Sequence, residues 1–338
     1  MDLESIESYK DKLNEKIRYL NETIWEHKIA GKVERWLNNF EDDKERINSL
    51  FLLSQFMYFG SHSMRELLKS LFRDLYKYHK IEQIRLRNSN TINLTFINEQ
   101  FDIELNNTRF LGVGNPSESG THLLYFFRQE NQLSKKLFID AHEIFKYTNN
   151  TKADGTVELV RCLENENITE YVFLDDFCGS GSQAKKYNRT IVNDIKSINP
   201  DIRVSYIMLF STKNGKDIIK KSTQFDYVEA IFELDESFKC FSESSRYFKK
   251  QPDFVTKEEC IIICEKYGKP QIENVLKKEI EDERKLAIAV EKHKYGFGDC
   301  QLLLGFHHNT PDNTLPIFWY DEDKIWSPIF RRYNKIYF

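Results

Sequence analysis

Two adjacent carboxylates, Asp175 and Asp176, stand at the end of an apolar run and are followed by a loop of small residues. The stretch is FLDDFCGSGSQ, from Phe173 to Gln183. Small residues let successive backbone N–H groups approach a phosphate closely, and the start of a following helix favours a negative charge. Such a turn could bring the backbone close to a cofactor or a phosphate, and at least two enzyme classes use a similar arrangement.

One of these classes is the DNA methyltransferases, which place an FxGxG turn after a strand to let the backbone approach the cofactor. The segment FCGSG matches that turn, but Asp176 stands where these enzymes usually have Pro. The segment 115–118 lacks the second Pro and the aromatic residue of their catalytic stretch, and the strand ending MLFST carries no acid for the cofactor ribose. These mismatches argue against an S-adenosylmethionine-dependent methyltransferase, which stays as an alternative.

The same stretch resembles the phosphoribosyl pyrophosphate (PRPP) signature of type I phosphoribosyltransferases. That signature has an apolar strand, two acids, about three variable residues, Ser or Thr, Gly, a variable residue and Thr. Gln183 replaces the final Thr, and Gly179 stands where several purine-acting members have a catalytic acid, which argues against purine-base transfer by that route. The resemblance implies a cradle for the 5′-phosphate formed by Cys178, Gly179, Ser180, Gly181, Ser182 and Gln183.

The resemblance also implies roles for the two acids. Asp175 and Asp176 would hold the ribose hydroxyls in a cleft and, indirectly, Mg²⁺ bound to the highly charged substrate. Transfer or hydrolysis at the anomeric carbon would then depend on positioning and charge stabilisation more than on a strong base.

A second loop has the layout by which type I phosphoribosyltransferases hold pyrophosphate. It lies in VGNPSESGTHLLYFF, after a short strand candidate and before a helix. A nucleotide P-loop does not fit, because five residues rather than four separate Gly114 from Gly120 and no Lys follows. The predicted pyrophosphate loop comprises Asn115, Ser117, Glu118, Ser119, Gly120 and Thr121.

The wider chain is similar to a divergent branch of this family, the phosphoribosyltransferase-like proteins of prokaryotic conflict systems. The stretches that carry this similarity are WLNNF with the following ERINSLFLLSQF, GNPSESGT and HNTPDNTLPIFW. The similarity implies an effector of an anti-phage module, including some retrons. Its partners would be a reverse transcriptase with its RNA–DNA hybrid, or other defence subunits, and we expect an oligomer.

Two further segments are candidates for ligand contact. In HNTPDNTLPIFW, side chains could converge on a base or a second substrate, or could close a structural turn by bonding their own backbone. The candidates there are His308, Asn309, Asp312 and Asn313. The segment Ser237–Lys250 is a candidate lid whose Arg246 and Lys249 could meet pyrophosphate oxygens, with a solvated surface segment as the alternative.

The elements that position these loops alternate along the chain. Strand candidates occur in TINLTFINEQFDIEL, TRFLGVG, TEYVFLDD, IRVSYIMLF and YVEAIFEL, with helix candidates between most of them. Alternation of this kind is typical of a parallel α/β sheet, whose ligands collect at the carboxyl ends of the strands. We predict an α/β fold, a phosphoribosyltransferase-like parallel sheet flanked by helices. Residues 1–88 would form a helical N-terminal portion, and residues 89–338 the α/β domain with an irregular C-terminal extension.

Composition limits the classes of function. The 338 residues carry 30% charged side chains but a net charge of only −4, which argues against a broad nucleic-acid-binding surface. No apolar stretch approaches the roughly 20 residues of a membrane span, and the polar start is not a signal peptide. Six scattered cysteines without a CxxC pair predict reduced thiols in a cytoplasmic protein. A non-catalytic nucleotide-sensing or interaction subunit would have the same fold, so that alternative stays open.

Overall fold

The computed structural model describes residues 3–26, 29, 31–114, 119–321 and 325–332. The chain forms two compact units, each described here by itself. Unit 1 combines residues 1–64 with residues 234–338, and unit 2 comprises residues 65–233. Neither division coincides with the predicted boundary at residue 88. Residues 65–88 of the predicted helical portion belong to unit 2, because the π-helical turn Leu71–Lys77 packs against the sheet strand Arg203–Thr212.

A four-stranded sheet forms the centre of unit 2. Its strand order is β2-β5-β6-β7, and β5 pairs in parallel with both β2 and β6. The strands are β2 (Thr108–Gly112), β5 (Glu170–Cys178), β6 (Arg203–Thr212) and β7 (Tyr227–Leu234). The predicted α/β class and these four predicted strands are therefore confirmed.

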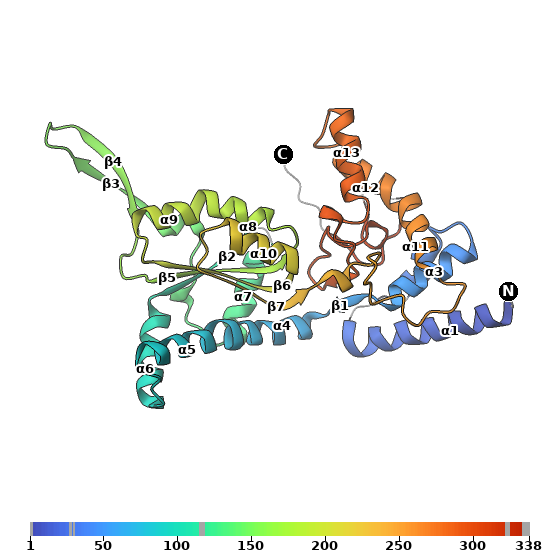
Figure 1. Cartoon of the computed structure of the whole chain (residues 1–338), viewed down its shortest axis with the longest axis horizontal. Coiled ribbons are helices and arrows are strands. Elements are labelled where there is room, and N and C mark those ends of the chain that lie inside the picture. The colour runs from blue at the N-terminus through green and yellow to red at the C-terminus, as the bar shows by residue number, and fades with distance from the viewer. Residues whose placement is uncertain (1–2, 27–28, 30, 115–118, 322–324, 333–338) are drawn as a thin grey trace. The chain divides into compact units, whose positions relative to one another are not determined.

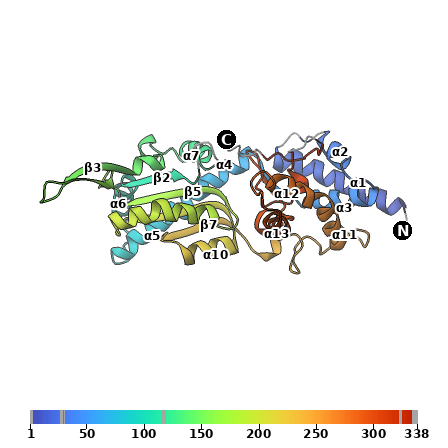
Figure 2. The ribbon, with the colours of Figure 1, turned by 90° about the horizontal axis from the view of Figure 1, so that it is seen from above.

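Helices cover both faces of this sheet (Figures 1 and 2). On one face, Ala184, Ile195 and Ile219 pack with Tyr171 and other apolar side chains of β5 and β6. The helices there are α8 (Ser182–Tyr187), a π-helical turn (Asn188–Val192), α9 (Asn193–Ile198) and α10 (Lys213–Ser222). The other face is covered by the π-helical turn Leu71–Lys77, α5 (Tyr78–Arg87) and α7 (Ser119–Glu130).

Two parts of unit 2 differ from the prediction. The segment TINLTFINEQFDIEL, predicted as a strand, forms helix α6 (Leu94–Asn106). The Asn93 side chain caps this helix by accepting from Phe96 N, and Ile97 and Phe101 bury one helical face at i, i+4 spacing. Capping and helical spacing thus outweigh the strand-forming residue types. An antiparallel hairpin of β3 (Phe145–Thr151) and β4 (Val157–Leu163), which we had not predicted, extends from this unit (Figure 1).

Unit 1 is mainly helical and joins distant parts of the sequence. Strand β1 (Met57–Phe59) pairs in parallel with β8 (Leu304–Phe306), and the helix before it ends at Ser54. Residues 269–293 contain two separate helices, because the Asp282 side chain caps the second one by accepting from Lys285 N. The helices are α1 (Leu3–Leu20), α2 (Lys32–Leu37), α3 (Asp43–Ser54), α11 (Lys257–Ile263), α12 (Lys269–Leu276) and α13 (Glu283–His293).

Short helical turns and one helix at the division complete the secondary structure. Helix α4 (Ser61–Ser70) contains the first division between the units. Further π-helical turns span Asn21–Trp25 and Cys264–Gly268, and 3₁₀ turns span Lys135–Leu137, Ala141–Ile144, Glu236–Phe238, Phe297–Asp299 and Pro316–Phe318. All six cysteines are free thiols, as predicted. Of the helices in the described ranges, none has the length and apolar composition needed to cross a membrane.

A buried charge network lies at the amino end of β5. The Glu170 carboxylate, 2% exposed, forms an ion pair with the Lys80 ammonium, 6% exposed. Lys80 Nζ also lies 3.3 Å from Glu104 Oε2, and Arg203 Nε lies 3.4 Å from Glu170 Oε1. Ser205 Oγ donates to the same carboxylate. These partners compensate a charge that burial alone would make very unfavourable.

Replacing Lys80 by Met should therefore destabilise unit 2 by about 3–5 kcal/mol, because the Glu170 charge would stay buried without its main partner. The measurement is urea unfolding followed by the far-ultraviolet signal. The matched control is Lys152→Met on the exposed hairpin, where Lys152 pairs with Glu158 at 2.7 Å. Loss of such a surface pair should cost about 0–1 kcal/mol. Equal losses in the two variants would show that the buried network does not stabilise the unit.

Candidate functional site

Asp175 and Asp176 lie near the carboxyl end of β5, an interior strand of the sheet. This confirms the predicted position of the two acids on a parallel strand. Their side chains are buried, however, with exposed fractions of 5% for Asp175 and 8% for Asp176, and not open to a cleft as we had expected. The structure thus shows a buried carboxyl pair near the carboxyl end of an interior strand.

The two carboxyl groups interact with each other and with a buried tyrosine. Tyr206 Oη donates to Asp175 Oδ2 at 2.6 Å, and Asp176 N donates to Asp175 Oδ1 at 3.0 Å. Burial first, and then the charge of Asp176, raise the pKa of Asp175 well above its ordinary value. Asp175 therefore keeps its proton to a higher pH than an exposed aspartate, and the pair titrates as one unit.

The loop after β5 begins a helix directly, as predicted. Gly181 has φ +74° and precedes α8, which starts at Ser182. Ser180 Oγ and Ser182 Oγ are hydrogen-bonded at 2.8 Å. Burial raises the pKa of Cys178 to about 12, so this residue contributes backbone rather than a reactive thiolate. The six predicted cradle residues are thus brought together in one strand-to-helix turn.

A neighbouring turn fixes the cradle in place, and sequence analysis missed it. Thr212 Oγ1, at the end of β6, donates to Gly179 O at 2.6 Å and accepts from Gly215 N at 2.9 Å. A Cβ atom at Gly215 would lie 2.2 Å from Gly179 O. Thr212 and Gly215 therefore position the cradle, and Thr212 could have been found as the N-cap residue of α10.

The second loop leaves the same edge of the sheet. Gly112 of β2 pairs with Leu174 of β5 in parallel register, so the chain after both strands emerges at one edge. Gly114 N donates to Tyr187 Oη at 2.8 Å, and this hydroxyl donates back to Gly114 O. The two loops are therefore joined through α8.

The pyrophosphate role of the second loop stays a prediction. Asn115, Ser117 and Glu118 lie outside the described residues. Ser119, Gly120 and Thr121 form the first turn of α7, which confirms the predicted helix.

Cations lie beside the cradle on its following helix. A cavity of about 300 Å³ is lined by Ser182, Lys185, Lys186, Arg189 and Thr190. Three positive side chains on the first turns after the predicted cradle favour an anionic ligand.

The described residues do not form a cage for Mg²⁺. They contain no group of three or more His, Cys, Asp or Glu side chains that could hold a metal ion. Both oxygens of Asp175 already accept hydrogen bonds. Direct ligation by Asp175 therefore does not fit this arrangement.

The candidate acceptor residues belong to unit 1, where their contacts are those of a structural turn. Arg332 Nη2 donates to Asp312 Oδ2 at 2.9 Å, and Asn313 Nδ2 donates to Phe297 O at 2.8 Å. The His308 ring stacks on Phe306, and Phe306 N donates to Asn309 O at 2.9 Å. These contacts support the structural alternative, and contact with a second substrate stays a prediction.

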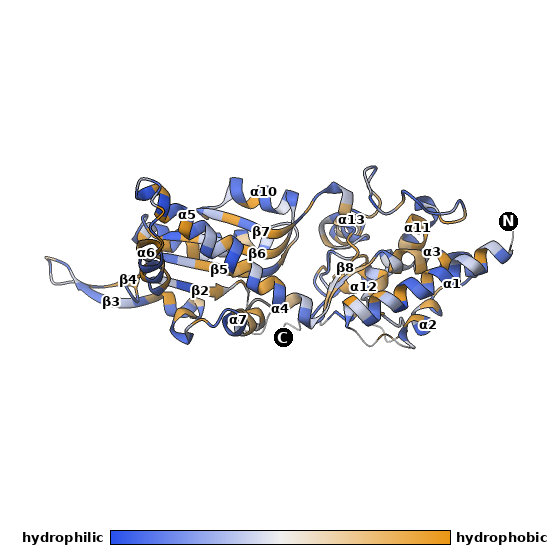
Figure 3. Ribbon diagram, turned by 90° about the horizontal axis from the view of Figure 1, so that it is seen from below, coloured by the Kyte–Doolittle hydropathy of each residue, from blue (hydrophilic) through white to orange (hydrophobic). Residues whose placement is uncertain are grey.

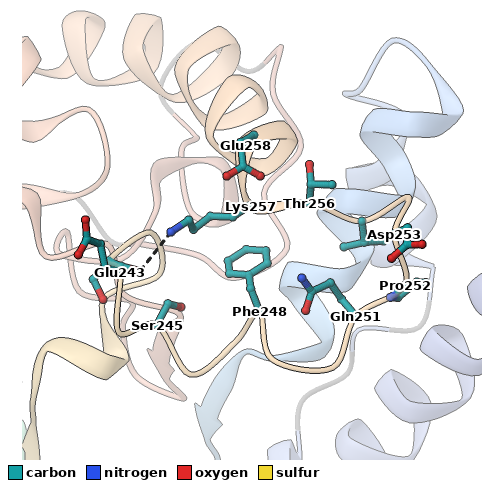
Figure 4. A pocket seen from close by; sticks show the side chains of 11 residues that line it. Glu243, Ser245, Phe248, Gln251, Pro252, Asp253, Thr256, Lys257 and Glu258 are labelled. Atoms are coloured by element: carbon teal, nitrogen blue, oxygen red, sulfur yellow. Dashed lines mark hydrogen bonds between the residues drawn. The ribbon is translucent and has the colours of Figure 1, made fainter.

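The candidate lid also belongs to unit 1 and borders a polar cavity (Figure 4). The cavity has a volume of about 380 Å³, and its wall includes Glu243, Asp253 and Glu258. Lys257 Nζ donates to Ser242 O at 3.5 Å within it. Acids dominate this wall. Arg246 and Lys249 line a different cavity of the same unit, so their contact with pyrophosphate stays a prediction.

Comparison with known proteins identifies a family. The family model PRTase-CE matches residues 33–332. A search of curated proteins gave no match.

Solved structures show weak likeness to parts of the chain. AQ2163 protein from Aquifex aeolicus is 10% identical, covers 61% of this chain and 84% of its own, and has a TM-score of 0.28. Helicobacter pylori xanthine-guanine-hypoxanthine phosphoribosyltransferase is 9% identical, with a TM-score of 0.26, and the match covers 53% of this chain and 92% of that protein. Giardia lamblia APRTase complexed with 9-deazaadenine is 7% identical, with a TM-score of 0.24, and the match covers 49% of this chain and 83% of that protein. At such scores these likenesses say nothing about what this chain binds.

The raised pKa of Asp175 predicts a pH-dependent cost of folding. As the pH rises above about 3.9, the unfolded chain releases this proton while the folded chain keeps it, so stability falls until the folded pKa is passed. Asp175→Asn removes that cost. The variant should melt at a higher temperature than the wild type at pH 7–8, about 2–4 °C for each kcal/mol gained, with the gap closing near pH 3.

The control for this series is Asp201→Asn, an exposed aspartate of the same unit. It should follow the wild-type curve at every pH. An Asp175→Asn melting temperature equal to or below the wild-type value at pH 8 would contradict the raised pKa.

Because of the close contact at Gly215, we expect Gly215→Ala to destabilise the protein, although helix propensity alone would predict a gain in stability. Within a helix, Gly→Ala gains about 1 kcal/mol from propensity. Here the new Cβ would overlap Gly179 O, so Gly215→Ala should instead lose about 1–3 kcal/mol in urea unfolding. Asn214→Ala, at an exposed neighbouring position, is the control and should be neutral or stabilising. A stabilised Gly215→Ala variant would show that the cradle is not held by this contact.

Proposed function

This chain belongs to the PRTase-CE family, and we propose that it is a phosphoribosyltransferase-like enzyme that binds PRPP, or a related ribose 5-phosphate compound or nucleotide. It would act at the anomeric carbon of that ligand. The observation that carries the proposal is the carboxyl pair of β5, followed directly by a small-residue turn into α8. The family match favours this function over the methyltransferase, and the experiment below separates it from a non-catalytic subunit.

In this proposal the 5′-phosphate lies on the backbone N–H groups of residues 179–183. Thr212 holds Gly179 in place before the ligand binds, so these donors lose little conformational entropy on binding. The cations Lys185, Lys186 and Arg189 add favourable charge on the same helix.

The carboxyl pair acts on the ribose. The ribose hydroxyls would replace some of the hydrogen bonds that Asp175 and Asp176 make within the protein. A carboxylate would stabilise the positive charge that develops at the anomeric carbon. Pyrophosphate leaves toward the loop after β2. We propose that Mg²⁺ arrives with the pyrophosphate-bearing ligand rather than on a site of the protein.

The biological setting is also a proposal. We infer an anti-phage effector that works in the cytoplasm as an oligomer, with a reverse transcriptase and its RNA–DNA hybrid, or other defence subunits, as partners. This rests on the resemblance of WLNNF, GNPSESGT and HNTPDNTLPIFW to proteins of prokaryotic conflict systems.

Thermal unfolding with ligands tests the proposal. PRPP at 100 times its Kd should stabilise the wild type by about 2.7 kcal/mol, ribose 5-phosphate and AMP should protect less, and S-adenosylmethionine should have no effect. The double variant Asp175→Asn, Asp176→Asn should fold but lose the protection by PRPP, because an amide cannot supply the charge-assisted hydrogen bond, about 1.5–3 kcal/mol, between a carboxylate and a ribose hydroxyl.

The matched control, Asp201→Asn with Asp217→Asn, removes two charges from the same unit and should keep the protection. Protection by S-adenosylmethionine alone would restore the methyltransferase. The same two double variants, expressed with the neighbouring genes and challenged with phage, test the defence role. Full protection by a folded Asp175→Asn, Asp176→Asn variant would favour the non-catalytic subunit.

A further inference from the structure

Unit 1 contains a cavity that is unrelated in sequence to the carboxyl pair and its cradle. Its volume is about 480 Å³, within the roughly 300–1,000 Å³ of small-molecule sites. Its walls come from α1, the end of α3 and the segment 246–250. It is therefore built by two parts of the chain that are about 200 residues apart, both within one unit.

One face of α1 forms the first wall. Tyr9, Lys12, Leu13 and Lys16 line the cavity at i, i+3, i+4 and i+7, the spacing of one helical face. Leu13 is buried in the core of unit 1, whereas the two lysines are exposed. Figure 3 shows this mixture of hydrophobic and hydrophilic residues on α1. The wall is therefore apolar at its base and positive at its rim.

The facing wall is also positive. Arg246, Lys249 and Lys250 line it. Arg246 Nη2 donates to Ser237 Oγ at 2.6 Å, and its guanidinium carbon lies 3.3 Å from the centre of the Phe238 ring, so its position is fixed. Arg246 also has a distant acid, Asp235 Oδ1, at 3.8 Å.

The charge of this cavity has no internal compensation. Together with Lys12 and Lys16 of α1, the facing wall gives five cations, and no Asp or Glu is among the described residues that line it. Within the described part of the chain, Lys12, Lys16, Lys249 and Lys250 take part in no ion pair. A concave site lined by one sign of charge concentrates ligands of the opposite sign.

The base of the cavity is aromatic and contains an unsatisfied hydroxyl. Phe51 and Tyr247 belong to the hydrophobic core of unit 1, and Tyr9 packs against it. Tyr247 is 8% exposed, and its buried Oη has no hydrogen-bond partner among the described residues. A buried hydroxyl without a partner is unfavourable, so a polar atom of a ligand would relieve that cost.

We propose that this cavity binds a mononucleotide. The phosphates would lie among the lysines at the rim. The nucleobase would lie against the aromatic side chains at the bottom of the cavity, with one polar atom of the nucleobase near Tyr247 Oη. An anion alone would leave the apolar wall unused, and a volume of about 480 Å³ suits one nucleotide better than a strand. This site is additional to the ribose-phosphate cradle of unit 2.

The test is titration of the full-length protein with a fluorescent ATP derivative. Lys249→Ala with Lys250→Ala should weaken binding about tenfold or more, because charge-assisted contacts to phosphate are lost. Tyr247→Phe removes only the hydroxyl and should weaken binding about threefold or more. Neither change should abolish protection by PRPP, which reports on unit 2.

The matched control is Lys277→Ala with Lys278→Ala, two adjacent exposed lysines elsewhere in unit 1. It should bind the probe like the wild type, and unlabelled ATP should displace the probe better than inorganic triphosphate or adenosine. Four results would overturn the proposal: no loss in the Lys249→Ala, Lys250→Ala variant, an equal loss in the control, displacement by triphosphate as efficient as by ATP, or tighter displacement by a single-stranded oligonucleotide. Displacement by PRPP at its own Kd would instead place the probe in unit 2.

Discussion

The Gly179 carbonyl is the point on which the arrangement of the site depends. It accepts from Thr212 Oγ1, and Gly215 approaches it so closely that no side chain fits between them. One contact therefore sets the distance between the turn after β5 and the turn after β6. The phosphate cradle is consequently a property of two neighbouring strand-to-helix turns, not of the glycine-rich stretch alone.

The carboxyl pair shows a second constraint, which is energetic. Burial and repulsion by Asp176 disfavour a negative charge on Asp175, while Tyr206 Oη donates a hydrogen bond to the Asp175 carboxyl group. Groups with strongly shifted pKa values cluster at functional sites, because folding tolerates their cost where chemistry needs them. The Glu170 network at the other end of β5 differs, since Lys80 and Arg203 compensate its charge. The same strand thus carries a compensated and an uncompensated acid at its two ends.

Most elements around the site could be predicted from local pattern. The apolar run before Asp175 indicated β5, and Gly and Ser after it indicated a turn into a helix. The roles of Thr212 and Gly215 could not be predicted, because Thr212 contacts a carbonyl 33 residues away. Helix α6 was predicted wrongly because residue types were weighed above the Asn93 cap. The extent of unit 1 was missed because its two parts are separated by all of unit 2, and no linker composition marks the joints.

The discontinuous unit 1 has a consequence for synthesis on the ribosome. Trp36 stacks on Phe318 and donates to Ile317 O, a contact spanning 281 residues, and β1 pairs with β8. At about 5–20 residues per second, the amino-terminal part waits on the order of 10–50 s for these partners. Unit 2 is complete in the nascent chain long before that. During the interval Trp36 and Phe40 lack their carboxyl-terminal partners Phe318, Tyr267 and Trp326, so the emerging amino-terminal helices are a natural client for chaperones.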